Sequence, residues 1–227
     1  MQKMSNEKFK QVFDIAAPEY DATSNPFMVH TRKIIFDQWA AGRCLEVGAG
    51  TGEISKFLSN KRGGVVATDI SPKMVQQMKK RGIEAYECDA ENLPFSDNSF
   101  DSVISAEMLF YLDNPDNFLK EAYRVLRPEG RLLISCASNF PMKFYDKIRS
   151  ALRSFGIKKW TCCDDPLKDF MTTPKLKAML IRNGFNIVEE KKAPIFPFAA
   201  LNSLNRIFAK TPLRHFGIFI FVYAQKN

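Results

Sequence analysis

Residues 44–52 read Cys44-Leu45-Glu46-Val47-Gly48-Ala49-Gly50-Thr51-Gly52. A short apolar segment is followed there by three glycines at alternate positions and then by a segment of helical character. Glycine has no Cβ, so it permits a tight turn and lets a ligand approach main-chain N–H groups. A strand, a glycine loop and a helix in this order form the nucleotide-binding corner of doubly wound α/β folds. The segment therefore predicts a nucleotide-like ligand at this corner.

The spacing of the glycines argues against a dinucleotide. The dinucleotide fingerprint places its third glycine at position 53, where this chain has Glu53. Glu46 and Glu53 flank the loop, so a pyrophosphate bound at the N-terminus of the following helix would face two carboxylates. A cationic adenosine ligand without phosphate avoids that repulsion. S-adenosylmethionine, which is a sulfonium, is such a ligand.

Further segments extend the pattern along the chain. An apolar segment, 65–69, ends in Asp69 and is followed by Ile70-Ser71-Pro72. Asp69 lies 17 residues beyond Gly52 (69 − 52), close to the offset of roughly 20 residues at which an acid binds ribose hydroxyls in such folds. Three more segments follow in order: Cys88-Asp89-Ala90-Glu91-Asn92-Leu93-Pro94-Phe95, the strand-like 100–105, and 124–134 with its Pro-Glu-Gly turn.

In order and spacing these segments resemble the motifs of the class I S-adenosylmethionine-dependent methyltransferases. The similarity covers about residues 43–136 and is loose in the flanks. The group it resembles includes ubiquinone and menaquinone biosynthesis methyltransferases and many small-molecule enzymes. The resemblance implies a Rossmann-like, doubly wound α/β fold with a seven-stranded sheet, mostly parallel with the last strand antiparallel. It also implies S-adenosyl-L-methionine as cofactor and methyl transfer to O, N or C of a small, partly apolar acceptor.

The resemblance further implies a set of cofactor contacts. Asp69 would bind the ribose, with a helix cap as its alternative role, and Asp89 the adenine amino group, with an ordinary turn as the alternative. Ile70 and Met74 would pack on the adenine faces or form a buried helix face. Tyr20, in a Glu-Tyr-Asp context, would fold over the methionine end or anchor a loop. The full set is Tyr20, Glu46, Gly48, Ala49, Gly50, Asp69, Ile70, Met74, Asp89, Ala90 and Ala106.

The sequence nominates no secure catalytic residue. Tyr111 stands where many relatives carry a histidine, and it could donate a hydrogen bond to the acceptor or serve as a base. A buried aromatic is the favoured alternative for Tyr111. His30 is the other weak candidate, because the chain has only two histidines, His30 and His215. Neither histidine accompanies a serine or cysteine nucleophile motif, so hydrolase chemistry is poorly supported.

The charge pattern is more informative than the net charge of +8. A basic chain can bind nucleic acid, but the Lys and Arg residues are scattered, which favours a solvated surface. The acids instead concentrate at predicted strand ends: Glu46, Asp69, Asp89 and Glu107. A negatively charged edge of the sheet suits a sulfonium ligand. An RNA methyltransferase that uses the basic surface, and a non-catalytic module that binds S-adenosylmethionine, stay open as alternatives.

The pattern along the chain predicts a single domain, 1–227, because this length fits one core. It divides into an N-terminal helical lid (1–41), a cofactor-binding core (42–138) and two aromatic-rich lid insertions (139–172 and 194–216). Periodicity and caps predict helices over 5–17, 27–41, 52–60, 72–81, 115–125 and 174–183. Strands are predicted over 43–48, 64–69, 84–88, 100–106, 130–136, 185–190 and 218–224.

Other classes of protein are disfavoured. No apolar run reaches the roughly 18 residues of a membrane span. The N-terminus is polar and has no signal-peptide pattern, so a cytoplasmic location is expected. The five cysteines are an odd number and suggest reduced core residues. Adjacent Cys162-Cys163 lacks metal-site spacing, so no metal is expected. The sequence does not specify an oligomeric state.

Overall fold

Seven strands form one sheet in the order β3-β2-β1-β4-β5-β7-β6. The computed structural model describes residues 6–24, 26–62, 64–138, 171–193, 202–208, 210–211, 217 and 219–227. Within them β1 to β5 are parallel to one another, and β7 is antiparallel to both β5 and β6. The predicted fold class is therefore confirmed. The strands are β1 (Cys44–Val47), β2 (Val65–Asp69), β3 (Glu84–Glu87), β4 (Phe100–Ala106), β5 (Leu126–Ala137), β6 (Phe185–Ala193) and β7 (Phe219–Lys226).

Most of the predicted helices agree with the structure to within a few residues. The described helices are α1 (Asn6–Ala16), α2 (Tyr20–Thr23), α3 (Pro26–Trp39), α4 (Glu53–Arg62), α5 (Pro72–Lys80), α6 (Pro115–Val125), α8 (Thr173–Arg182) and α9 (Asn202–Phe208), with a 3₁₀ turn, η1, at Leu109–Tyr111. The sequence does not predict the three shortest of these elements, α2, η1 and α9. They are too short to show a helical period in the sequence.

The starts of three helices follow from a cap residue and a proline. Ser71 Oγ accepts the N–H of Met74 at 3.1 Å at the start of α5, and Pro72 occupies the first helical turn. Asn114 with α6 and Thr172 with α8 show the same arrangement. A polar cap satisfies an N–H group that has no partner within the helix, and proline lacks that N–H.

One strand differs from its predicted bounds. The strand β5 begins at Leu126, whereas the sequence predicts it from residue 130. Leu126 pairs with Phe100, and the register then shifts before Ser102 pairs with Arg131. Glu129 has a φ of 61° inside this irregular stretch. The predicted turn is therefore a bulge within the strand pair rather than a loop before it.

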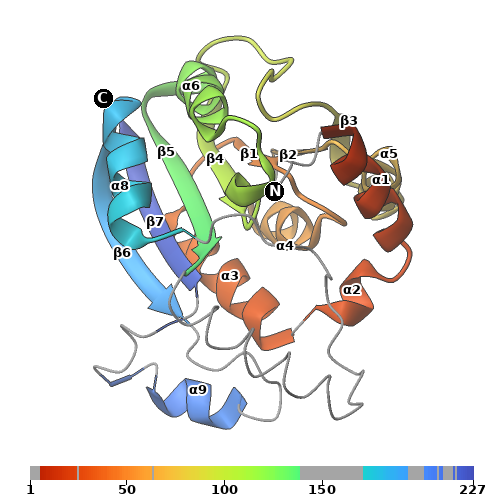
Figure 1. Cartoon of the computed structure of the whole chain (residues 1–227), viewed down its shortest axis with the longest axis horizontal. Helices are drawn as coiled ribbons and strands as arrows, with labels where there is room; N and C mark the ends of the chain where they lie inside the picture. Colours follow the sequence, from red (N-terminus) through yellow and green to blue (C-terminus); the bar gives the residue numbers. More distant parts are fainter. Residues whose placement is uncertain are drawn as a thin grey trace.

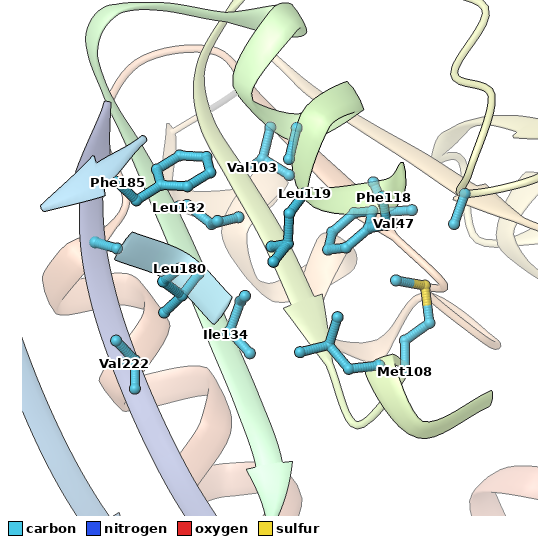
Figure 2. Packing of buried hydrophobic residues seen from close by; sticks show 14 of the residues in the cluster. Val47, Val103, Met108, Phe118, Leu119, Leu132, Ile134, Leu180, Phe185 and Val222 are labelled. Atoms are coloured by element: carbon cyan, nitrogen blue, oxygen red, sulfur yellow. The ribbon is translucent and has the colours of Figure 1, made fainter. Parts of the chain in front are cut away.

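Two apolar layers enclose the sheet. On one face α6 and α8 pack against side chains of β1, β4, β5 and β7. Figure 2 shows Phe118 and Leu119 of α6 in the same cluster as Val103 of β4 and Leu132 of β5. On the other face α3 and α4 cover β1, β4, β5 and β7, and α5 covers β2 and β3. Figure 1 shows α1 and α5 beside β3 at one edge of the sheet and α8 beside β6 at the other.

The parallel strands all direct their carboxyl ends to one edge of the sheet, where ligands of open α/β sheets bind. The glycine loop and the ends of β2, β3 and β4 meet there. Residues 139–170 and most of 194–216 lie outside the described residues. The structure therefore describes the predicted lid insertions only at 171–172, 202–208 and 210–211, and Cys162-Cys163 lies outside the described residues. Of the helices described, none is long and apolar enough to cross a membrane.

Candidate functional site

A cavity of about 370 Å³ opens at the carboxyl edge of the sheet. Its walls come from the glycine loop, the ends of β2, β3 and β4, and helices α1, α2 and α3. Predicted cofactor contacts from these separate segments line it together: Tyr20, Gly48, Gly50, Asp69, Ile70, Asp89, Ala90 and Ala106. Tyr111 also lines the cavity, whereas His30 is exposed on α3 and does not.

The glycine loop needs glycine for space as well as for conformation. Gly48 and Gly50 have φ values of 69° and 57°. A Cβ on Gly48 would lie 2.7 Å from Met108 Cγ, and one on Gly50 would lie 3.4 Å from Tyr20 Cε1. Side chains at these two positions would therefore fill the space between the loop and the residues that face it, Met108 and Tyr20. The backbone of the loop is left accessible to a ligand.

Asp69 ends β2 and faces the cavity. Its Oδ2 accepts the N–H of Gly50 at 2.8 Å, and its Oδ1 accepts the N–H of Ser71 at 2.9 Å. Burial raises the pKa of Asp69 to about 6, while the backbone N–H groups of Ser71, Gly50 and Ile70 oppose that rise. The cap of α5 is Ser71, so Asp69 does not cap the helix. A carboxylate accepts about four hydrogen bonds, which leaves Asp69 capacity for a ligand.

Three predicted contacts lie away from the cavity. Glu46 is buried beneath the loop and accepts a hydrogen bond from Ser55 Oγ, which ties β1 to α4. Burial raises the pKa of Glu46 to about 7, Ser55 and Arg32 lower it, and Asp69 raises it further. Met74 is fully buried in α5, and Ala49 packs on the cluster between α5 and the sheet. Their part in binding stays a prediction.

Aromatic side chains cover the cavity. The ring of Tyr111 meets Phe13 edge-on at 5.2 Å and Phe9 at 5.3 Å, and Phe13 lies 6.5 Å from Tyr20. All four line the cavity. The sequence predicts the helix that carries Phe9 and Phe13, but periodicity alone does not say which element that helix covers. Tyr111 is thus packed among aromatics and also reaches the cavity.

Polar contacts hold α2 and α3 onto the glycine loop. Thr51 Oγ1 donates to Asp21 Oδ1 at 2.5 Å, and Arg81 forms ion pairs with Asp21 and Glu53. Lys33 of α3 pairs with Glu53 at 2.5 Å. This network links residues that are about 60 positions apart in the sequence, namely Asp21 and Arg81. It fixes Tyr20 above Gly50.

Arg32 and Glu107 form a charged part of the cavity wall. The sequence indicates Glu107 only as one of the acids at predicted strand ends, and it does not point to Arg32. Burial raises the pKa of Glu107 to about 7, and the Arg32 charge and Ser135 oppose that rise. Within the described part of the chain, Arg32 Nε and Glu107 Oε2 are buried without a hydrogen-bond partner.

Comparison with known proteins agrees with this geometry. Residues 45–134 match a family described as methyltransferase domain. The ubiquinone/menaquinone biosynthesis C-methyltransferase of Desulfotalea psychrophila is 40% identical over 97 residues, which is 40% of this chain and 39% of that protein. An uncharacterized protein of Methanocaldococcus jannaschii is 28% identical over 95% of this chain and 98% of its own length.

A solved structure shares the fold over nearly the whole chain. It is an S-adenosylmethionine-dependent methyltransferase of Thermotoga maritima, described as a possible histamine N-methyltransferase. The TM-score is 0.68 at 23% identity, and the match covers 96% of this chain and 99% of that one. By contrast, the chain spans less than half the length of the Desulfotalea enzyme.

Residues 45–134 are similar to a methyltransferase domain, and the seven-stranded sheet agrees with the fold of the solved methyltransferase. The comparisons support an S-adenosylmethionine-dependent methyltransferase that resembles the ubiquinone and menaquinone biosynthesis enzymes, and they imply S-adenosyl-L-methionine as the cofactor. The cavity residues fit that cofactor. Asp69 and Asp89 offer hydrogen-bond acceptors, Arg32 offers a cation with an unpartnered N–H, and the glycine loop leaves its backbone open.

Proposed function

We propose that this chain transfers the methyl group of S-adenosylmethionine to an O, N or C atom of a small, partly apolar acceptor. The observation that carries the proposal is the convergence of predicted contacts from five separate segments on one cavity. The cavity falls in the size range of small-molecule sites and combines apolar walls with few polar groups. The surroundings of the cavity suit a cationic, phosphate-free ligand, because Asp69, Asp89 and Glu107 line it.

The proposed contacts divide along the cavity. Asp69 binds the ribose hydroxyls, because the two main-chain N–H groups fix its carboxylate in one orientation. Ile70 and Asp89 enclose and recognise the adenine. Tyr20 and Arg32 hold the methionine end, where the guanidinium pairs with the carboxylate. A charged pair of this kind is stronger than a neutral hydrogen bond.

The sulfonium supplies an electrophilic methyl group when it is bound. The protein's part is to align the acceptor with that group and to exclude water. Alignment of reacting groups can supply on the order of 7–11 kcal/mol of the barrier. Phe9, Phe13 and Tyr111 are placed to exclude water, because their rings close the cavity from the side of α1.

Calorimetry with S-adenosylhomocysteine and NAD tests the cofactor. We expect S-adenosylhomocysteine to bind with a micromolar Kd, about −8 kcal/mol, and NAD not to compete. Incubation of the chain with labelled S-adenosylmethionine and a pool of small metabolites then tests transfer. Tight NAD binding without any heat from S-adenosylhomocysteine would end the proposal. Cofactor binding without any methylated product would favour the non-catalytic module.

A further inference from the structure

Glu107 follows the end of β4, and Ser135 and the backbone N–H of Ala137 both lie close enough to lower the pKa of its carboxyl group. Ser135 Oγ of β5 donates to Oε1 at 2.6 Å. Oε2 is buried and has no hydrogen-bond partner among the residues that the structure describes. A buried acceptor without a donor carries a desolvation cost. Native proteins keep few such atoms, and a ligand or a water that completes the bonding is a usual reason.

The backbone at Glu107 is held in an unfavourable conformation. Its φ is 58°, in the left-handed region that side chains rarely adopt. The N–H of Glu107 donates to the carbonyl oxygen of Ser135 at 3.0 Å, so the same residue fixes both the backbone and Oε1. The turn also sets Met108 against Gly48 of the glycine loop. Strain that is held in place in this way occurs at ligand sites.

The surroundings of Glu107 in the cavity wall are mostly apolar. Met28 and Val29 of α3 and Met108 line the cavity together with it. Arg32 is the cation that faces it from α3. Burial raises the pKa of the Cys136 thiol of β5, and the nearby Glu107 charge raises it further. This part of the cavity suits a molecule with an apolar body and one polar hydrogen.

We infer that Glu107 contacts the methyl acceptor, and that its Oε2 accepts a hydrogen bond from the hydroxyl or amine group that is methylated and takes its proton. The inference rests on the proposed function and names the acceptor class: a partly apolar molecule whose reacting atom carries a hydrogen. It assigns the β4–β5 side of the cavity to the acceptor. Asp69 and Asp89, at the ends of β2 and β3, stay on the cofactor side.

The proton balance of the transfer gives such a group a role. The bond from the acceptor O or N to the methyl carbon forms as the C–S bond breaks, and the electron pair of that bond stays on sulfur. The acceptor O or N then carries excess positive charge until it loses its hydrogen. Glu107 takes that proton and becomes neutral. Burial raises the pKa of Glu107 to about 7, so the carboxylate can accept a proton near neutral pH.

Paired probes test the contact. The chain, loaded with S-adenosylhomocysteine, is titrated with 2-naphthol against 2-methoxynaphthalene, and with phenethylamine against its N,N,N-trimethyl derivative. We expect at least one protic probe to bind about tenfold more tightly than its methylated partner, equivalent to about 1.4 kcal/mol. Glu107→Gln should reduce that preference below about threefold, because a neutral amide is a weaker acceptor than a carboxylate. The probe pair that shows the preference separates hydroxyl from amine acceptors.

Glu129→Gln is the matched control. Glu129 also has a left-handed φ, of 61°, but it is exposed and does not line the cavity. The Glu129→Gln variant should keep the preference for the protic probe. With S-adenosylmethionine and that probe, Glu107→Gln should lower kcat by about 10²–10⁴-fold and abolish the rise of the rate with an apparent pKa near 7. Ser135→Ala keeps the carboxylate and removes a contact that lowers its pKa, so the pH midpoint should rise.

Several outcomes overturn the inference. Equal binding of protic and methylated probes to the wild-type chain would overturn it, and so would the absence of binding by either protic probe. An undiminished preference for the protic probe in folded Glu107→Gln would also overturn it. An unchanged pH profile in a folded, active Ser135→Ala variant also counts against it. Failure of S-adenosylhomocysteine to bind would instead contradict the proposed function. If Glu107→Gln does not fold, Ser135→Ala decides the question.

Discussion

The main-chain N–H of Gly50 donates a hydrogen bond of 2.8 Å to Oδ2 of Asp69. This contact joins the glycine loop after β1 to the end of the neighbouring strand β2, across 19 positions of sequence. It orients the carboxylate and the loop together on one wall of the cavity. The two motifs that the sequence singles out therefore form one rigid unit.

Replacement of Asp69 by Ala should weaken cofactor binding. The variant loses the acceptor for the proposed ribose contacts, and charged hydrogen bonds contribute roughly 1.5–3 kcal/mol each. We expect the Kd for S-adenosylhomocysteine to rise about ten- to a hundredfold in calorimetry. Asp97→Ala, which removes a more exposed carboxylate outside the cavity, should not change it. Unchanged affinity in a folded Asp69→Ala chain would show that Asp69 serves only to hold the loop.

A comparison of Gly50→Ala with Gly82→Ala separates the cost of backbone strain from the effect of a side chain that enters the cavity. Both glycines have positive φ, 57° and 72°, so either substitution should cost roughly 1–2 kcal/mol of stability. A Cβ on Gly82 meets nothing within 4 Å, whereas one on Gly50 enters the space beneath Tyr20. Only Gly50→Ala should therefore lose affinity for S-adenosylhomocysteine. Equal affinity of the two variants in calorimetry would mean that the loop backbone is not approached by the ligand.

The sequence predicts the core of this fold well because its signals are local. Alternating glycines, acids at strand ends and pairs of a cap residue with proline each act within a few residues. The structure has Gly50 in the loop after β1 and Asp69 at the end of β2, as they predict. The contribution of Arg32 could not be foreseen, because it depends on how α3 lies over the sheet. For Glu46 the sequence position and the side-chain contact point to different roles. Its position beside the glycine loop suggests a ligand contact, but its side chain points to Ser55 of α4.

Buried carboxyl groups predict how stability depends on pH. Burial raises the pKa of Glu46 to about 7, above its ordinary value near 4.5, so the folded chain holds a proton that the unfolded chain has released between these values. The stability associated with Glu46 is therefore complete below about pH 4.5 and is lost as the pH rises through about 7. Burial of Glu107 and Asp69 acts in the same direction.

Glu46→Gln tests this pH dependence, because glutamine is neutral throughout and its oxygen can still accept from Ser55. At pH 8 the variant should be more stable than the wild-type chain by about 1–3 kcal/mol. At pH 4.5 the two should agree. Urea unfolding at both pH values measures the difference, with exposed Glu129→Gln as control. An equal effect of Glu46→Gln at both pH values would contradict the proposed ionisation.

The contacts of Asp21 predict how the N-terminal helices close the cavity. Asp21 accepts from Thr51 of the glycine loop and pairs with Arg81. Because α2 is only four residues long, these contacts rather than its own hydrogen bonds should hold it in place. Asp21→Ala should raise hydrogen exchange over residues 18–24 and leave exchange in β1 and β4 unchanged. Through the displacement of Tyr20, it should also weaken S-adenosylhomocysteine binding by about three- to tenfold, in line with partly exposed ion pairs.

Asp37→Ala is the matched control, because Asp37 also pairs with two cations, Lys61 and Arg62, but joins α3 to α4 away from the cavity. Its exchange over 18–24 and its cofactor affinity should equal those of the wild-type chain. Addition of S-adenosylhomocysteine to the wild-type chain should increase protection over 18–24, because a ligand under Tyr20 adds contacts to α2. Lids of this kind move on microsecond-to-millisecond scales, so the effect is a change in population rather than a slow step. If ligand binding is demonstrated and protection over 18–24 does not change, α2 is a fixed wall of the cavity and not a lid.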